Sequence, residues 1–317
     1  MDRNLEMMQK WISIPTLLLC LILGLESHAQ QDPKFNQYMF NPLGINPAYA
    51  GSREALSVVA LYRNQWVGFD GAPVTQTFSI HGPLKQKKMG LGFQITNDVI
   101  GPRNTISAEV DYAYRFRLWR GQMSLGLGLG VQYLSFDWNK ITYKDEGDVI
   151  PTYGLEQVVI PDADFGIFYH TNTFYAGLEL AHLAEPRIVV SDSTVNGSNA
   201  YRQFRHLSVV VGRAFVLNDN LTLRPSILYK QAGLFQGMLD ANVSVLIDNK
   251  LWAGLTYRHG YGGVIILEYI VTEVVRIGYS FDYPFNNLRL SQGTSHEIFL
   301  GLEFNIPKSR TVSPRYF

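Results

Sequence analysis

The feature that most constrains this chain is an alternation of apolar with polar or small residues that recurs along most of its length. From Met123 to Tyr133 every second residue is apolar, and the residues between them are Ser, Gly or Gln. The same pattern runs through Ile106–Phe116 and Val275–Tyr283. Successive side chains of a β-strand point to opposite faces, so each segment predicts a strand with one apolar face and one polar or small face.

Fourteen such segments follow one another, close to the ~10-residue length that is typical of a transmembrane β-strand. The least regular is 262–271, because Val264–Leu267 are consecutive apolar residues. The segments lie near residues 55–63, 74–82, 88–97, 103–116, 122–137, 163–170, 173–182, 203–214, 220–230, 236–247, 249–258, 262–271, 273–283 and 293–305. We therefore predict an all-β fold, a transmembrane outer-membrane antiparallel β-barrel of about 14 strands over residues 55–305, with its apolar face against outer-membrane lipid.

A soluble β-sandwich or β-propeller is the alternative for such a pattern, and the lengths of the connections argue against both. In bacterial outer-membrane barrels short periplasmic turns alternate with extracellular loops that are often long. Short polar turns at Thr171–Asn172, Asn218–Asn220 and Asp248–Asn249 fall at even-numbered connections, whereas the long stretches 138–162 and 183–202 fall at odd-numbered ones. A soluble sandwich has no reason to sort its loops in this way.

The N-terminus has the layout of a secretory signal peptide. Arg3 and Lys10 precede an apolar run, Trp11–Leu25, and Ser27–Ala29 forms a small-x-small cleavage site. The run has about 15 residues, fewer than the ~20 that span a bilayer as a helix. We predict a signal peptide over residues 1–29, a periplasmic N-terminal segment over 30–54, a C-terminal tail over 306–317, and an outer-membrane location after cleavage near Ala29.

The composition and the motifs exclude several classes of function. Lys and Arg number 27 and Asp and Glu number 27, so the chain lacks the basic excess of a nucleic-acid-binding domain. The sequence has no P-loop, no Gly-x-Ser-x-Gly motif and no closely spaced histidine pair. We therefore predict no catalytic, cofactor-binding or metal-binding residues, and expect that the protein is not an enzyme.

The charged residues of the predicted strands lie mainly on the polar face, which points into the lumen if the apolar face meets lipid. Two interpretations remain open: a lumen filled by paired charges, because unpaired buried charge is costly, or a selective aqueous pore. The residues concerned are Arg63, Glu109, Asp111, Arg115, Asp164, Glu179, Arg224, Asp240, Arg258, Arg276, Asp282, Glu297 and Glu303.

Several short motifs are more specific than the alternation. The chain reads FNQYMFNP over residues 35–42, NPAYAG over 46–51 and YRNQWVGF over 62–69. Further motifs are GAP over 71–73, TQT over 75–77, SFDYP over 280–284 and GTSHEI over 293–298. Together they resemble the PorP/SprF family of outer-membrane proteins associated with the type IX secretion system.

This resemblance implies an outer membrane of the Bacteroidota type and a role in secreting adhesins or anchoring them at the cell surface, in some members linked to gliding motility. It implies as partners a secreted protein with a type-B-like C-terminal sorting domain and other type IX secretion components, and it brings no catalytic residues. A passive porin or hydrophobic-solute transporter is the alternative. Asn64, Gln65 and Trp66 are candidate partner contacts, although Trp66 could instead pack at the barrel rim.

Overall fold

The computed structural model describes residues 32–53, 55–84, 88–141, 155–189, 200–233, 237–285 and 293–304. The expected signal peptide (1–29) and C-terminal tail (306–317) lie outside these ranges. Among the described residues, no helix is both long and apolar enough to cross a membrane.

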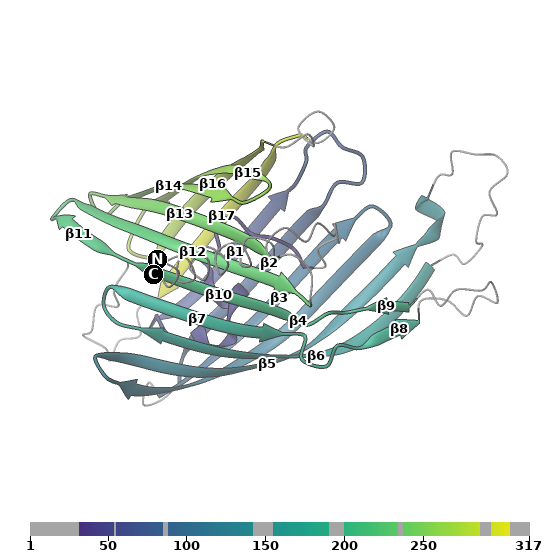
Figure 1. Ribbon diagram of the computed structural model, residues 1–317, viewed down its shortest axis with the longest axis horizontal. Coiled ribbons are helices and arrows are strands. Elements are labelled where there is room, and N and C mark those ends of the chain that lie inside the picture. Colours follow the sequence, from purple (N-terminus) through teal and green to yellow (C-terminus); the bar gives the residue numbers. More distant parts are fainter. Residues whose placement is uncertain are drawn as a thin grey trace, which may run out of the picture.

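The described chain is built almost entirely of β-strands (Figure 1). Three short 3₁₀ helices accompany them: η1 (Pro42–Ile45), η2 (Pro47–Tyr49) and η3 (Trp138–Lys140). The strands are β1 (Leu56–Asn64), β2 (Val74–Pro83), β3 (Met89–Ile100), β4 (Arg103–Leu118), β5 (Gly121–Asp137), β6 (Leu155–His170), β7 (Phe174–Ala181), β8 (Arg187–Val189), β9 (Ala200–Arg202), β10 (His206–Arg213), β11 (Phe215–Asn218), β12 (Leu221–Ala232), β13 (Met238–Ile247), β14 (Leu251–Arg258), β15 (Gly262–Ile270), β16 (Val275–Pro284) and β17 (Ser295–Phe304).

The strands form one closed antiparallel sheet. Strands β1 to β7 pair in chain order, as do β11 to β17, while β1 pairs with β17 and β10 pairs with both β7 and β12. The short strand β11 continues β10 after Ala214 along the same partner, β12, so the wall has fourteen strand positions. Strands β8 and β9 form a separate two-stranded sheet. The predicted barrel of about fourteen strands is therefore confirmed.

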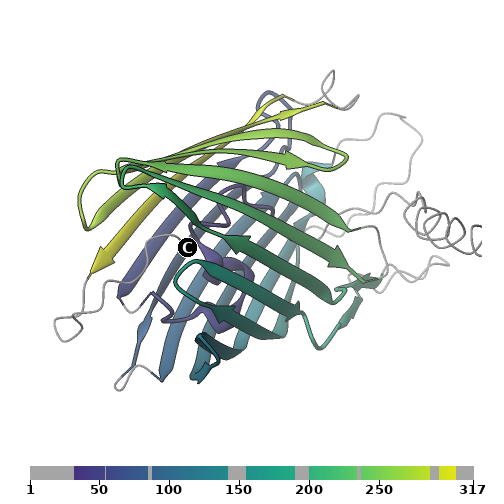
Figure 2. The ribbon, with the colours of Figure 1, turned by 60° about the vertical axis from the view of Figure 1, so that its left-hand side comes forward.

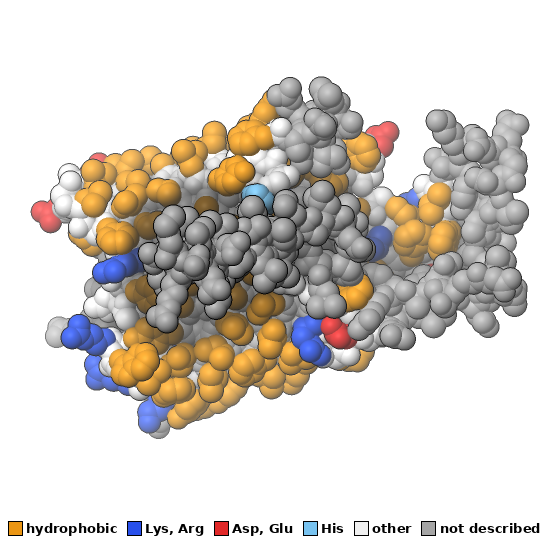
Figure 3. Space-filling view, viewed as in Figure 1, with side chains coloured by type: hydrophobic (Ala, Val, Ile, Leu, Met, Phe, Trp, Pro, Cys, Tyr) orange, Lys and Arg blue, Asp and Glu red, His pale blue; other side chains and the backbone are white. Residues whose placement is uncertain are grey.

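The alternation of the sequence becomes the two faces of the wall. On β5 the side chains of Leu125, Leu127 and Leu129 point outward and are 40%, 43% and 57% exposed. Ser124 and the glycines between these leucines point inward and are buried. Hydrophobic side chains cover much of the visible outer wall (Figure 3). An outward apolar face is the arrangement that a barrel in lipid requires.

The two ends of the barrel differ in the length of their connections. At one end, here the turn end, Asp248 and Asn249 have φ values of 49° and 53°, the left-handed backbone that a tight turn demands. The long connections after β1, β5, β7 and β16 all lie at the other end, here the loop end. β4, β5 and β6, with 16, 17 and 16 residues, extend beyond β7, which has 8. The predicted sorting of loop lengths is present, although residues 155–162, which were expected in the long connection 138–162, belong to β6.

Residues 32–53 lie inside the barrel, and we call them the N-terminal plug (Figure 2). They are the described part of residues 30–54, which the sequence predicts to be a periplasmic N-terminal segment. The plug contributes the centre of the buried hydrophobic cluster, with Tyr38, Leu43 and Tyr49 at most 2% exposed. The wall therefore has a core to pack against on its inner face.

Candidate functional site

A buried polar cluster holds the first part of the plug against the wall. Glu297 of β17 accepts hydrogen bonds from the backbone N–H groups of Asn36 and Gln37, each at 2.9 Å. Arg63 of β1 donates to Glu297 at 3.3 Å and to Asp282 of β16 at 2.9 Å. The Asn36 amide donates to Ser280 and Asp282, at 3.0 and 3.2 Å. We call Asn36, Arg63, Asp282 and Glu297 the polar node.

The polar node is stable only as a unit, because the side chains of Arg63, Asp282 and Glu297 are 0% exposed. One guanidinium faces two carboxylates, which leaves one negative charge unpaired. The backbone N–H groups of the plug stabilise that charge by donating hydrogen bonds to the Glu297 carboxylate. Buried charges are tolerated when they are paired and hydrogen-bonded, and removal of one partner leaves the others uncompensated. The plug is thus part of the charge balance of the wall.

Asn46 fixes the second half of the plug to the opposite wall. Its side-chain oxygen accepts from the Ala48 N–H at 2.9 Å and caps η2, while its amide donates to the carbonyls of Ile167 and Leu178 at 3.0 and 3.1 Å. Inward-facing glycines leave space for this contact: a Cβ on Gly126 would lie 2.2 Å from the Ala48 nitrogen, and one on Gly166 would lie 2.1 Å from the Asn46 oxygen.

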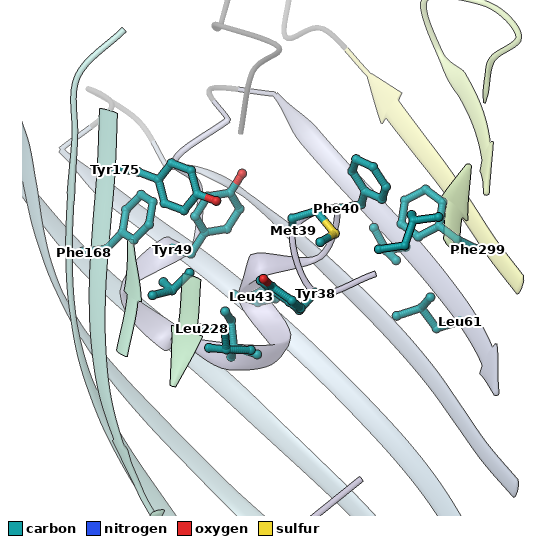
Figure 4. Packing of buried hydrophobic residues seen from close by; sticks show 14 of the residues in the cluster. Tyr38, Met39, Phe40, Leu43, Tyr49, Leu61, Phe168, Tyr175, Leu228 and Phe299 are labelled. Carbon is teal, nitrogen blue, oxygen red and sulfur yellow. The ribbon is translucent and has the colours of Figure 1, made fainter. Parts of the chain in front are cut away.

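Aromatic side chains of the plug pack against aromatic side chains of the wall (Figure 4). The Phe40 ring lies 6.4 Å from that of Trp252 and 6.0 Å from that of Phe299, and the Arg224 guanidinium lies 4.1 Å from the Trp252 ring. At the other side of the lumen, Tyr49 meets Phe168 edge-on at 5.2 Å. Aromatic pairs of this geometry add about 0.5–1.5 kcal/mol each beyond the area that they bury.

Ion pairs continue along the inner face. Arg258 pairs with Asp240 at 2.8 Å, Arg276 with Glu268 at 3.0 Å, and Arg53 of the plug with Glu303 at 2.7 Å. Burial in the plug, together with the nearby Arg258 guanidinium, lowers the pKa of Lys34 to about 8. Of the two interpretations of the lumen, the one with paired charges agrees with these contacts.

A family model matches residues 27–302 of the sequence, and its description is "Type IX secretion system membrane protein PorP/SprF". The match spans most of the chain, including the plug and nearly all of the barrel. The chain belongs to the PorP/SprF family. The family description names a membrane component of a secretion system and no catalytic activity.

Solved structures that resemble this PorP/SprF barrel include a porin, an outer membrane protein and a toluene transporter. The KdgM porin is 10% identical, with a TM-score of 0.39, over 78% of this chain and 99% of its own. The Acinetobacter baumannii outer membrane protein Omp33 is 10% identical, with a TM-score of 0.44, over 80% and 99%. The Ralstonia pickettii toluene transporter TbuX is 10% identical, with a TM-score of 0.45, over 79% and 88%. No curated protein sequence matches the chain.

The motifs that resemble PorP/SprF proteins meet in the polar node. Asn36 belongs to the motif at 35–42, Arg63 to that at 62–69, Asp282 to that at 280–284 and Glu297 to that at 293–298. Segments separated by as many as 261 residues therefore share one buried set of hydrogen bonds. In this PorP/SprF chain these four motifs supply the residues that attach the plug to the wall.

The candidate partner contacts lie at the loop end, where β1 leads into β2. Asn64, Gln65 and Trp66 are half-buried, and the backbone N–H of Trp66 donates to the Ser295 hydroxyl at 3.2 Å. The neighbouring side chains of Val67 and Phe69 are 45% and 48% exposed. These two residues were not among the predicted contacts, although two apolar residues on either side of Gly68 in a loop are a signal for exposed apolar contacts. The partner contact itself stays a prediction.

A second group of polar residues surrounds a cavity of about 110 Å³ between the plug and the inner face of the wall. Asp32 of the plug lies between His182, directly after β7, and His206, the first residue of β10. The sequence offered no signal for this group, because Asp32 is 150 residues from His182 and 174 residues from His206. Carboxylates lining the cavity are those of Asp32, Glu109, Asp162, Asp164 and Glu179.

Proposed function

We propose that this PorP/SprF protein is a plugged outer-membrane barrel that supports the secretion or cell-surface anchoring of an adhesin-like partner, in a role connected with gliding motility. The main support is the N-terminal plug, in which Ala48 and Ala50 are 0% exposed and Tyr38 and Tyr49 at most 2%. A barrel that fills its own lumen acts through its loops and its outer surface rather than through an open pore.

The proposed partner is a secreted protein with a type-B-like C-terminal sorting domain, held together with other type IX secretion components. Support for the family role comes from the match over residues 27–302. We place the contact at the loop end, which in outer-membrane barrels faces the outside of the cell. Val67 and Phe69 are exposed apolar side chains there, and the half-buried Asn64, Gln65 and Trp66 directly precede them in the chain.

Before assembly, we propose, the segment 1–29 is removed near Ala29, and the plug then forms the start of the mature chain. The alternative function, a passive porin or hydrophobic-solute transporter, requires a continuous path through the lumen. It predicts steady ion conductance or solute uptake and no dedicated secreted partner. The two functions are therefore separable in one preparation of the full chain.

The test is affinity purification of the tagged full chain from outer membranes, with identification of the proteins that co-purify. We expect a large secreted protein with a C-terminal sorting domain. The double variant V67S/F69S should recover at least about tenfold less of it, because two exposed apolar anchors contribute about 1 kcal/mol or more each. Trp119→Ser is the matched control, since Trp119 is 86% exposed on the connection from β4 to β5, at the turn end. Recovery of the barrel alone from all three preparations would contradict the proposal.

A further inference from the structure

The cluster around Asp32 has the composition of a transition-metal site. Its carboxylate lies 3.1 Å from Nε2 of His182 and 2.5 Å from Nδ1 of His206. The three potential ligand atoms lie within 4.8 Å of one another. Two imidazole nitrogens and one carboxylate oxygen are a ligand set that Zn²⁺ commonly takes, with bonds of about 2.0–2.2 Å.

His182 is oriented as a metal-binding histidine would be. Its Nδ1 lies 2.7 Å from the carboxylate of Asp162, so the opposite nitrogen, Nε2, faces Asp32. In metalloproteins a carboxylate on the far nitrogen fixes the tautomer and leaves the near nitrogen free to bind the metal. Nε2 of the Gln203 amide also lies 2.7 Å from Nδ1, and this amide accepts the same proton once it is turned to present its oxygen.

The surroundings supply an independent reason for a cation at this place. The cavity of about 110 Å³ beside the cluster is lined by five carboxylates, and the basic groups that line it are Lys230 and His182. Asp164, 7% exposed, accepts from the backbone N–H of His182 at 2.9 Å, and Asp162, Asp164 and His182 form a second, overlapping group of potential ligands. Several carboxylates around one small cavity repel one another, and a divalent cation offsets that repulsion.

We propose that Asp32, His182 and His206 bind a divalent transition-metal cation of the zinc class, with Asp162 orienting His182. The fourth position faces the cavity, where water or Asp164 completes the coordination. Each ligand comes from a different part of the barrel: Asp32 from the start of the plug, His182 from the end of β7 and His206 from the start of β10. The metal therefore links the plug to the wall at the loop end.

The test measures Zn²⁺ bound by the full chain, folded in detergent, stripped with a chelator and dialysed against zinc chloride. Wild type should bind one equivalent. The variants D32N and H206Q should bind at least ~100-fold more weakly, and D162N, which removes only the orienting carboxylate, ~10–100-fold more weakly. His259→Gln is the matched control, because His259 is an exposed histidine on the connection from β14 to β15 and should leave binding unchanged.

Two further measurements test the metal site on the wild-type protein, so they do not depend on whether a variant folds. Zinc-edge X-ray absorption of the wild-type protein should give two imidazole ligands and an oxygen shell, and it needs no substitution. Limited proteolysis should cut the plug faster after chelation and slowly again after Zn²⁺ is restored. Three results would each overturn the site: no retained equivalent, an absorption spectrum without imidazole, or binding that H206Q leaves intact in a folded barrel.

Discussion

At the scale of the residue, Arg63 connects the parts of the molecule that are furthest apart in sequence. It lies on the first strand, yet its guanidinium contacts Asp282 and Glu297 of the last two strands, and Glu297 in turn holds the backbone of Asn36 and Gln37. These side chains are fully buried, so their hydrogen bonds replace those that water would have made. One arginine thus couples barrel closure to the attachment of the plug.

Replacing Arg63 by methionine should lower the free energy of unfolding by about 3–5 kcal/mol, because two buried carboxylates lose their cation. The measurement is urea-induced unfolding of the full chain refolded into lipid vesicles. Arg120→Met, at an exposed position between β4 and β5, should change stability by less than about 0.5 kcal/mol. A loss of less than about 1 kcal/mol for Arg63→Met would show that Arg63 is not needed to compensate the buried carboxylates of Asp282 and Glu297.

At the scale of the element, the plug explains why some strands depart from simple alternation. In β15, Val264 and Ile266 point inward and are 2% and 1% exposed within the hydrophobic cluster, while Ile265 and Leu267 point outward and are 51% and 44% exposed. Both faces are apolar because one meets lipid and the other the core around the plug. The segment 262–271, the least regular in sequence, is therefore a regular strand with two apolar environments.

The glycines of β5 and β6 have the complementary task of making space for the plug. Gly126→Ala should displace the plug while leaving the wall paired, because the new Cβ meets the backbone nitrogen of Ala48 at 2.2 Å. We expect a cost of about 1–3 kcal/mol and faster proteolysis of the plug, with unchanged heat-modifiable mobility of the barrel.

Gly254→Ala, on the inner face of β14, is the matched control for this change. Its Cβ meets the Ser244 hydroxyl, which is able to rotate away, rather than a backbone atom. Equal protease sensitivity of the two variants and the wild type would contradict the role assigned to Gly126.

At the scale of the whole molecule, a closed barrel of fourteen strand positions encloses more space than wall side chains alone fill. Barrels of about eight strands are filled by their own side chains, whereas those of 16–18 strands leave an aqueous channel. Here residues 32–53 occupy the interior, packing against the wall through Tyr38, Phe40 and Tyr49. The apolar outer surface, the closed sheet and the plug together form an outer-membrane barrel with a filled lumen.

Deletion of residues 33–50 should convert a barrel that passes no ion current into one that conducts ions. The deletion removes the apolar centre and leaves charged residues of the wall, such as Arg224 and Asp240, facing open space. The measurement is single-channel current in planar bilayers, for which we expect no steps from the full chain and discrete steps from the deletion. Steady conductance of the full chain would contradict the plugged lumen and favour the porin alternative.

The strands, their number and the sorting of the turns were predictable from the sequence, because each depends on short-range pattern. Alternation over ten residues decides which side chains face lipid, and Asp248–Asn249 favours a tight turn wherever it lies. The position of the plug was not predictable in this way. The motif at 35–42 contains Asn36 but not Glu297, its partner 261 residues away.

The same difference applies to the candidate sites. Asn64, Gln65 and Trp66 were named from a local motif, and the structure leaves them half-buried at the loop end. The grouping of Asp32 with His182 and His206 exists only after the barrel has closed around the plug. The sequence by itself determined the wall, since backbone pairing in lipid follows from local periodicity. Tertiary structure alone decided what fills the lumen of the barrel, since packing and charge pairing depend on contacts between residues that are distant in the sequence.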